Sequence, residues 1–497
     1  MKIEEYLRHD ALGLAELVKT KQVTPSELLE TAIQRAQQVN PKVNAIISPL
    51  HQLGQEMAKQ SESCAEGRFQ GVPFLLKDLG VPLASYPCSE GSKLLQDNVP
   101  EEDGYLVTRY KKAGVVIFGK TNTPEFGLMG TTEPKQFGPS RNPWNTNHST
   151  GGSSGGSAAA IAAGIAPIAS AGDGGGSIRI PAACCGLFGL KPSRGRVSLG
   201  PDRADGWDGA VAEHILSRSV RDSAVMLDVS CGPEPGDPYF LPNPDISFEE
   251  SSNQDPKPLR IAFCKESPLG NTVDAECASA VENLARRLQA MGHHVEERKP
   301  DIHGPDIAKA YLTTYFGHVG AQIKALKKRY GAREIRDGLE EATRMFGMLG
   351  SAVSATDFVE QKNQWNRFGR TMGLFHQQFD LYLTPMLAEP PSVIGSLMPS
   401  SIEELGLRLA EKLHAGSLLH KTGVIEKIAI QSLEKTPFTQ LANLTGQPAM
   451  SLPVASSSKG LPIGVQVMAA IGREDLLFGI AGQLERDDPW SHKIAQL

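Results

Sequence analysis

The chain has 497 residues, of which 40% are hydrophobic and 21% are charged, a composition typical of a large globular protein. Fifty basic residues against 56 acidic residues give a formal net charge of −6, which argues against a surface dedicated to nucleic acid or to anionic membranes. The length allows two or three domains or one large α/β domain, and no apolar run is long enough to span a membrane.

The N-terminal residues lack the basic and then apolar pattern of a secretory signal, so the sequence predicts a cytoplasmic protein. Seven cysteines, an odd number scattered through a long chain, are typical of reduced thiols in such a compartment. Cys184 and Cys185 are adjacent in an apolar context, which favours packing over a nucleophilic role. The basic run Lys324–Arg336 is interpreted as a solvated helix face.

The first strong helix signal is a Thr-Pro-Ser-Glu tetrapeptide that begins at Thr24. Thr24 is expected to be the N-cap, the proline takes the first helical position, and Glu27 closes a capping box. This helix should run to about Val39 and end before Pro41. A strand and a second helix should follow, at 43–47 and 52–65.

An apolar strand is expected at 71–78, and it ends on Lys77 and Asp78. A lysine that continues an apolar strand is unusual, because burying an ammonium group is costly unless it is paired or loses its proton. Lys77 could also simply reach the surface, or pair with Asp78. The chain should then continue through a helix, a buried strand, a short helix capped by Thr123 and a polar loop, at 102–113, 115–119, from 124 onward and at 131–150.

Residues 151–187 contain two glycine-serine clusters joined by a run of small apolar residues. Glycine lets another group approach the main chain closely, so each cluster predicts a surface of peptide N–H groups that also carries serine hydroxyls. We expect a helix at 157–163, a buried strand at 165–171 and a loop at 173–177. Because α/β enzymes place their chemistry in loops at strand ends, the two clusters could face each other across one pocket.

The second half of the chain continues to alternate helices with strands, which indicates an α/β fold. Residues 232–258 are rich in proline and polar residues and are interpreted as a surface linker or a long crossover. His293 and His294 precede an expected edge strand, where exposure to solvent is the default. Helices are expected at 219–227, 274–291, within 305–380 and at 474–484, and strands at 259–264, 381–384, 452–454 and 465–469, the last two paired across a turn at 456–460.

Other catalytic signatures match the chain less well. Gly151–Gly155 fits the G-x-S-x-G pattern of a nucleophile elbow, but polar residues rather than an apolar strand precede it. Lys421–Gly423 mimics one element of the penicillin-binding enzymes, but both S-x-x-K matches come after it, in the reverse of the required order. No H-E-x-x-H pattern and no phosphate-binding glycine loop is present, so neither a metal nor a nucleotide is expected.

Three separated features together resemble the amidase signature family. They are Lys77 at a strand end, the GGSSGGS segment at 151–157 and the DGGGSIRIPA segment at 173–182. The spacing is also similar to that of the family, with 76 residues from Lys77 to Ser153 and 24 from Ser153 to Ser177. The similarity extends over most of the chain, from Glu27 to the last expected helix.

By that resemblance, Ser177 is the nucleophile that forms an acyl-enzyme, Ser153 is a bridging serine after a cis peptide bond, and Lys77 is the base. A lysine accepts a proton only when it is neutral, and burial at the end of an apolar strand lowers its pKa in that direction. Ser153 would relay protons between Lys77 and Ser177. The oxyanion hole would be formed by backbone N–H groups, those of Gly174, Gly175, Gly176 and Ser177.

The resemblance also implies a fold. It is a single large α/β domain at 1–497, with a mixed central β-sheet and helices on both of its faces. The signature core would lie at about 66–230, and a helical region at 300–430 would shape the substrate pocket. Asp173 and Arg179 are interpreted as bracing the second cluster rather than contacting substrate.

Segments 131–134, 141–145 and 471–476 are most similar to the branch of the family that contains 6-aminohexanoate cyclic-dimer hydrolase. The resemblance implies hydrolysis of a small linear or cyclic aliphatic amide such as that dimer, without a cofactor and without nucleic acid or membrane as partner, by a chain that could be a homodimer. One alternative is the glutamine-hydrolysing subunit of a tRNA-dependent amidotransferase, which needs partner subunits. Another is an inactive binding protein on the same scaffold, which is disfavoured because all three reactive positions are filled.

Overall fold

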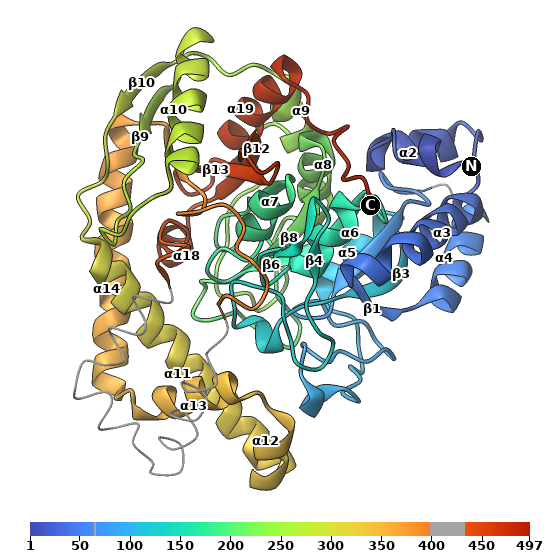
Figure 1. The fold of residues 1–497 in the computed structure, drawn as a ribbon, viewed down its shortest axis with the longest axis horizontal. Helices are drawn as coiled ribbons and strands as arrows, with labels where there is room; N and C mark the ends of the chain where they lie inside the picture. Colours follow the sequence, from blue (N-terminus) through green and yellow to red (C-terminus); the bar gives the residue numbers. More distant parts are fainter. Residues whose placement is uncertain (64–65, 398–432) are drawn as a thin grey trace.

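A computed structural model of the chain describes residues 1–63, 66–397 and 433–497, and the centre of this part is a mixed sheet of 11 strands (Figure 1). The strand order is β1-β3-β2-β6-β8-β7-β12-β13-β11-β9-β10. Strands β2, β3 and β6 pair in parallel, as do β9, β10 and β11, while the middle of the sheet is antiparallel. The strands are β1 Ile46–Pro49, β2 Pro73–Lys77, β3 Val116–Thr121, β6 Ile168–Asp173, β7 Phe188–Lys191, β8 Ala212–Ser217, β9 Arg260–Phe263, β10 His294–Glu297, β11 Leu381–Pro385, β12 Ala449–Ser456 and β13 Pro462–Ala469.

Helices cover both faces of this sheet, as adjacent residues of β7 make clear. Phe188 contacts Phe478 of α19 with ring centroids 6.2 Å apart, whereas Gly189 faces Ala182 of α7. Because successive residues of a strand point to opposite faces, the two helices lie on opposite sides. The helices are α1 Ile3–Tyr6, α2 Ala11–Lys19, α3 Pro25–Val43, α4 His51–Ser63, α5 Tyr105–Lys112, α6 Gly155–Ala162, α7 Arg179–Cys185, α8 Val220–Ser230, α9 Phe248–Asn253, α10 Ala275–Ala290, α11 Gly304–Tyr330, α12 Ala332–Gly338, α13 Glu341–Ala352, α14 Ala355–Gln378, α18 Gln440–Thr445 and α19 Glu474–Asp487.

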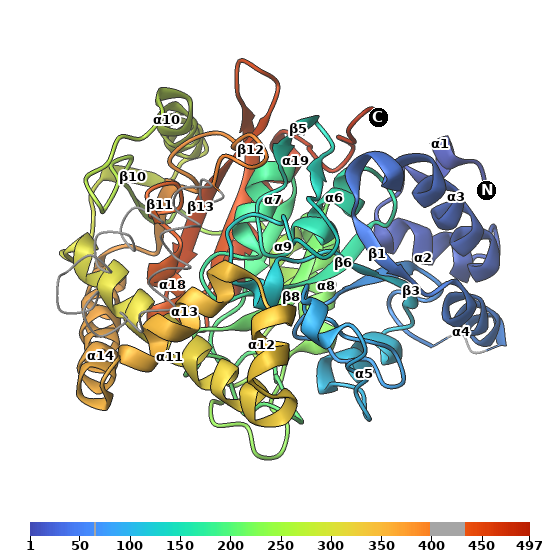
Figure 2. The same cartoon turned by 60° about the horizontal axis from the view of Figure 1, so that its bottom comes forward.

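One hydrophobic core extends along the sheet from Tyr6 near the N-terminus to Trp490 near the C-terminus. The chain therefore folds as a single large α/β domain, which confirms the fold class expected from the sequence. Helices α11 to α14 occupy most of the expected helical stretch at 305–380, and they project beyond the sheet on one side (Figure 2).

The start of α3 follows its sequence signal, but its end does not. Thr24 accepts a hydrogen bond from the Glu27 N–H at 3.2 Å, and the Glu27 carboxylate accepts one from the Thr24 N–H at 2.8 Å, which completes the capping box. The expectation that the helix ends before Pro41 is wrong, because it continues to Val43. Pro41 lies in the last turn, and Asn44 ends the helix in the left-handed conformation at φ 49°.

Several expectations about the connecting segments are also wrong. The stretch at 232–258 is not only a linker, because α9 forms within it and buries Phe248 against α19. The polar loop at 131–150 contains a small hairpin, β4 Arg141–Asn142 and β5 Asn145–Ser149. The short helix after Thr123 is a 3-10 turn at Glu125–Gly127 that begins after Pro124 without a side-chain cap.

Edge strand β10 is confirmed at the end of the sheet. Of the two histidines, His294 begins the strand and is exposed, whereas His293 precedes it and is buried. His293 is buried because its ring accepts the Leu259 N–H at 3.1 Å and meets Gln483 Oε1 at 3.0 Å. The basic run Lys324–Arg336 spans the end of α11 and α12, and its lysines and arginines are exposed as expected. The Lys421–Gly423 match lies outside the described residues. In the described ranges, no helix combines the length and apolarity needed to cross a membrane.

Candidate active site

Lys77 is the last residue of β2, and every residue of that strand is buried. Its side chain is only 2% exposed, and its backbone N–H donates to Ser170 Oγ of β6 at 2.7 Å. The Nζ atom lies 2.7 Å from Ser153 Oγ and forms a hydrogen bond with it. The structure thus brings together two of the three predicted catalytic side chains, although 76 residues separate them in the chain.

Burial is the main influence on the proton affinity of Lys77. It lowers the pKa of the Lys77 ammonium to about 8, against the opposing effect of the Glu213 and Asp173 carboxylates. An ordinary lysine titrates near 10.5, so Lys77 is neutral over a far wider part of the mildly alkaline range. A neutral amine held at a hydroxyl can accept its proton.

Ser153 follows a cis peptide bond from Gly152, and its side chain is 2% exposed. Only glycine fits at position 152, because a Cβ atom there would lie 2.5 Å from the carbonyl oxygen of Thr131. The next serine, Ser154, joins the first glycine-serine cluster to β6, since its hydroxyl lies 3.3 Å from both the N–H and the carbonyl oxygen of Gly172. The two clusters therefore meet, as the sequence predicts.

Ser177 lies in the loop between β6 and α7, and its side chain is partly exposed. In the described part of the chain, the Ser177 hydroxyl makes no hydrogen bond to Ser153, so the third predicted contact is not formed. Catalytic hydrogen bonds often form only when substrate is bound. Of the expected oxyanion donors, Gly176 already donates its N–H to Asp173 Oδ1 at 2.7 Å, which leaves the N–H groups of Gly174, Gly175 and Ser177.

Asp173 and Arg179 brace this loop, as expected. The Arg179 guanidinium donates two hydrogen bonds of 2.9 Å to the Asp173 carboxylate, and both side chains are fully buried. Burial alone would raise the pKa of Asp173, but Arg179 outweighs it and brings the pKa below its ordinary value. Arg179 also bonds to Thr439 O, Gln466 Oε1 and Asn443 Oδ1 at 3.0, 2.6 and 2.7 Å.

Replacing Arg179 with methionine is expected to lower the free energy of unfolding by roughly 3–5 kcal/mol, because it leaves a buried carboxylate without its cation. The measurement is urea denaturation followed by circular dichroism. Arg203 is a matched control, since its side chain is 49% exposed and lies 3.4 Å from Glu90. Its replacement by methionine should cost less than about 1 kcal/mol. Equal losses in the two variants would contradict the bracing role.

An aromatic wall beside the second cluster was not predicted from the sequence. A Cβ atom on Gly174 would lie 2.8 Å from the Trp207 ring, and one on Gly175 would overlap the Tyr311 hydroxyl. The Tyr311 ring stacks on Tyr315 with centroids 5.9 Å apart, and Trp207 meets Tyr315 edge-on at 5.3 Å. These rings come from α11 and from the loop before β8, far from the glycines in sequence, so no local pattern signals them.

The two adjacent cysteines are buried, and their thiols are poor nucleophiles. Burial raises the pKa of Cys184 to about 12 and that of Cys185 well above its usual value. This confirms the packing interpretation. Within the described ranges, no group of three or more histidine, cysteine or acidic side chains is arranged to hold a metal ion.

Comparisons with known proteins give a consistent result. A family model described as Amidase matches residues 27–478. The chain is 38% identical to a 6-aminohexanoate-cyclic-dimer hydrolase of Pseudomonas sp. (strain NK87), over 99% of this chain and 97% of the relative. A solved 6-aminohexanoate cyclic dimer hydrolase complexed with substrate superimposes with a TM-score of 0.87 at 36% identity, covering 99% of both chains. A bacterial aryl acylamidase of the amidase signature family gives a TM-score of 0.85 at 27% identity, over 98% of this chain and 97% of that one.

Proposed function

The chain belongs to the amidase signature family of carbon–nitrogen hydrolases, and on that premise we propose that it cleaves a small amide through an acyl-enzyme on Ser177. The observation that carries the proposal is the 2.7 Å contact between Lys77 Nζ and Ser153 Oγ inside a buried site. A lysine whose pKa burial lowers to about 8 has the proton affinity that a base needs near neutral pH.

In the proposed reaction, neutral Lys77 takes the hydroxyl proton of Ser153, and Ser153 takes that of Ser177. The Ser177 oxygen attacks the amide carbon, and the negative charge that develops on the carbonyl oxygen is stabilised by main-chain N–H groups of Gly174, Gly175 and Ser177. The carbon–nitrogen bond then breaks as Ser153 returns a proton to the departing amine. Water hydrolyses the ester on Ser177 by the same proton route, which frees the carboxylic acid.

We infer an aliphatic amide as the substrate class, either linear or cyclic, with 6-aminohexanoate cyclic dimer as the leading candidate. The full-length similarity to hydrolases named for that dimer, at 36–38% identity, supports it. The rings of Trp207 and Tyr311 are partly exposed, and Tyr315 is buried against both of them, so the first two offer a largely apolar surface to the methylene groups of such a substrate. In this proposal, α11 and the other described helices of the region at 300–430 shape the substrate pocket around the signature core at 66–230. Residues 398–430 of that region lie outside the described residues.

A panel of amides tests this function with the purified chain alone. We expect hydrolysis of 6-aminohexanoate cyclic dimer or a related aliphatic amide. Mass spectrometry detects the addition of one water, which opens the ring of a cyclic substrate and divides a linear one into an amine and an acid. The glutamine-hydrolysing subunit of an amidotransferase predicts instead that glutamine is cleaved only when partner subunits are added. The 36–38% identity to hydrolases named for 6-aminohexanoate cyclic dimer disfavours that alternative. A cytoplasmic location and a homodimer remain predictions.

A further inference from the structure

Glu213 is a buried carboxyl group that the proposed reaction does not use. It lies in β8 and pairs directly with Gly172 of β6, the residue before Asp173. Glu213 is only 6% exposed to solvent. In the described part of the chain, no group donates a hydrogen bond to its carboxylate. Its oxygens are not among the fully enclosed atoms without a partner, but a carboxylate this little exposed and without a protein donor is stabilised by a nearby positive charge.

Two glycines make room for this carboxyl group beside the site. A Cβ atom on Gly80 would lie 2.5 Å from Glu213 Oε1, and one on Gly172 would overlap the same oxygen. Gly80 follows the end of β2 by three residues, and Gly172 lies in the strand whose Ser170 hydroxyl accepts the Lys77 N–H. The carboxyl group therefore occupies the end of β2 and β6, where Lys77 also lies.

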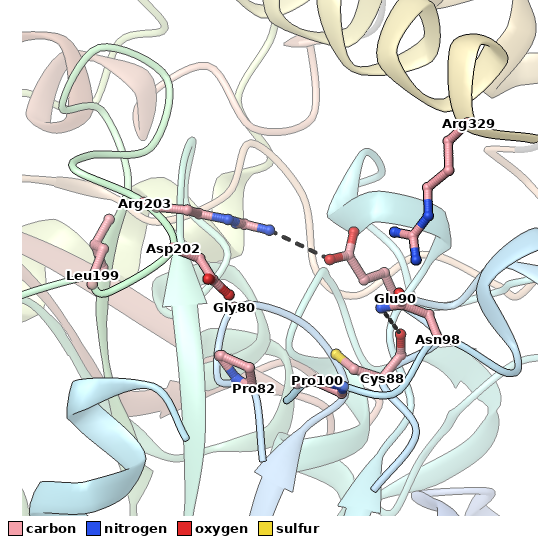
Figure 3. A pocket seen from close by; sticks show the side chains of 11 residues that line it. Gly80, Pro82, Cys88, Glu90, Asn98, Pro100, Leu199, Asp202, Arg203 and Arg329 are labelled. Carbon is pink, nitrogen blue, oxygen red and sulfur yellow. Dashed lines mark hydrogen bonds and ion pairs between the residues drawn. The ribbon is translucent and has the colours of Figure 1, made fainter. Parts of the chain in front are cut away.

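Gly80 also lines a cavity of about 250 Å³. Figure 3 shows Gly80 in its wall, together with Arg203, which reaches toward Glu90. The Nη2 atom of Arg203 lies 3.4 Å from Glu90 Oε1, and both residues line the cavity. Gly80 therefore contacts both the Glu213 carboxyl group and this cavity.

The charged and titratable groups around Glu213 come from four segments of the chain. They are Lys77 at the end of β2, Asp173 in β6, Arg203 in the loop before β8 and Tyr110 in α5. Burial raises the pKa of Glu213 to about 7, against the opposing effects of Lys77 and Arg203, while Asp173 adds to the rise. Lys77 and Glu213 form no direct ion pair in the described structure, so they act on each other through space.

We propose that Glu213 is a positioning residue whose carboxylate stabilises the protonated form of Lys77 and thereby sets the pH range in which Lys77 acts as a base. This inference rests on the proposed function, in which Lys77 becomes an ammonium each time Ser177 attacks. A nearby negative charge stabilises that ammonium, so the Glu213 carboxylate makes Lys77 a stronger base. For the same reason, Lys77 loses its proton only at a higher pH than it would without the carboxylate.

Replacing Glu213 with glutamine keeps the shape and removes the charge. Without the carboxylate, the midpoint of the alkaline rise in kcat/KM is expected to fall by about one pH unit. The limiting rate at high pH should fall several-fold, because a weaker base remains. A residue that only supports packing would lower the rate without moving the midpoint.

Lys77 should also be titrated directly by NMR of protein labelled with 13C at the lysine ε-carbons. The Lys77 signal is identified as the one that is missing from the spectrum of Lys77→Met. In Glu213→Gln we expect the midpoint of the Lys77 titration to fall by the same amount as the midpoint of the rate profile. In Glu213→Asp, which keeps the charge, the midpoint of the Lys77 titration should stay close to that of the unaltered chain. Glu485→Gln is the matched control, because Glu485 is a buried carboxyl whose pKa burial also raises to about 7 but which accepts the Val220 N–H on α8. It should leave the Lys77 titration unchanged.

The outcomes separate this inference from the proposed function. An unchanged Lys77 titration in folded Glu213→Gln overturns the inference, and so does a shift in Glu213→Asp as large as that in Glu213→Gln. If Glu213→Gln does not fold, Glu213→Met, which also removes the charge, takes its place with the same expected downward shift of the Lys77 titration. A shift of the Lys77 titration without any change in the rate profile would refute Lys77 as the base, and with it the role of Glu213 in setting the pH range, although the effect of Glu213 on the Lys77 ammonium would stand.

Discussion

Replacing Ser177 with alanine is expected to abolish amide hydrolysis, with kcat falling by at least about 10⁴-fold. Ser177 lies in the loop after β6, next to free main-chain N–H donors, and it is the only one of the three predicted catalytic side chains that is partly exposed to a substrate. Removing its oxygen removes the atom to which the acyl group would be bonded. Turnover of an aliphatic amide and the mass added by a fluorophosphonate probe are the two measurements.

Cys184→Ala serves as the control for this experiment, since the Cys184 thiol is buried and its pKa is raised to about 12. This variant should keep both its activity and its labelling. Probe labelling that persists in Ser177→Ala would place the nucleophile on another residue. Ser153→Ala should give a different result, slow but measurable labelling, because the nucleophile remains and only the proton relay is lost.

Local sequence patterns are sufficient to predict those helices and strands whose residues have the types that are usual at such positions. The Thr24 cap, the apolar β2 strand and the β12–β13 pair were all predicted in this way. Strands β7 and β8 were missed. Strand β8 carries Glu213 and His214 in fully buried positions, which contradicts the apolar pattern that a buried strand normally shows. Helix α9 was missed because a proline-rich segment surrounds it.

The candidate site likewise has residues that the sequence predicts and residues that it does not. The glycine-serine clusters and the buried lysine are local features, so the sequence could point to Lys77, Ser153 and Ser177 once their pattern was compared with a family. Which side chains lie around them depends on contacts between distant segments. The Tyr311 hydroxyl reaches Gly175 from α11, and the Glu213 carboxyl group fills space left by glycines in two other segments. Neither residue has a neighbour in sequence that would reveal its position.

Replacing Lys77 with methionine is expected to lower kcat/KM by about 10³-fold or more while the fold is retained. That loss corresponds to roughly 4 kcal/mol of transition-state stabilisation, at about 1.4 kcal/mol per factor of ten. Methionine keeps most of the side-chain volume inside the apolar end of β2, and it cannot accept a proton from Ser153. Steady-state kinetics with an amide substrate measure the loss, and circular dichroism checks the fold.

The same lysine determines the pH dependence of the unaltered chain. Because the pKa of Lys77 is lowered to about 8 and only the neutral amine is a base, the rate should be low at pH 6, rise through pH 8 and level off above it. Lys191 is the matched control, since burial lowers its pKa to about 7 but its Nζ donates to Pro192 O at 2.7 Å rather than to a serine. Lys191→Met should keep the rise through pH 8, whereas Lys77→Met should lose it. A rate that does not change between pH 6 and 9, with bond cleavage limiting, would mean that no lysine serves as the base.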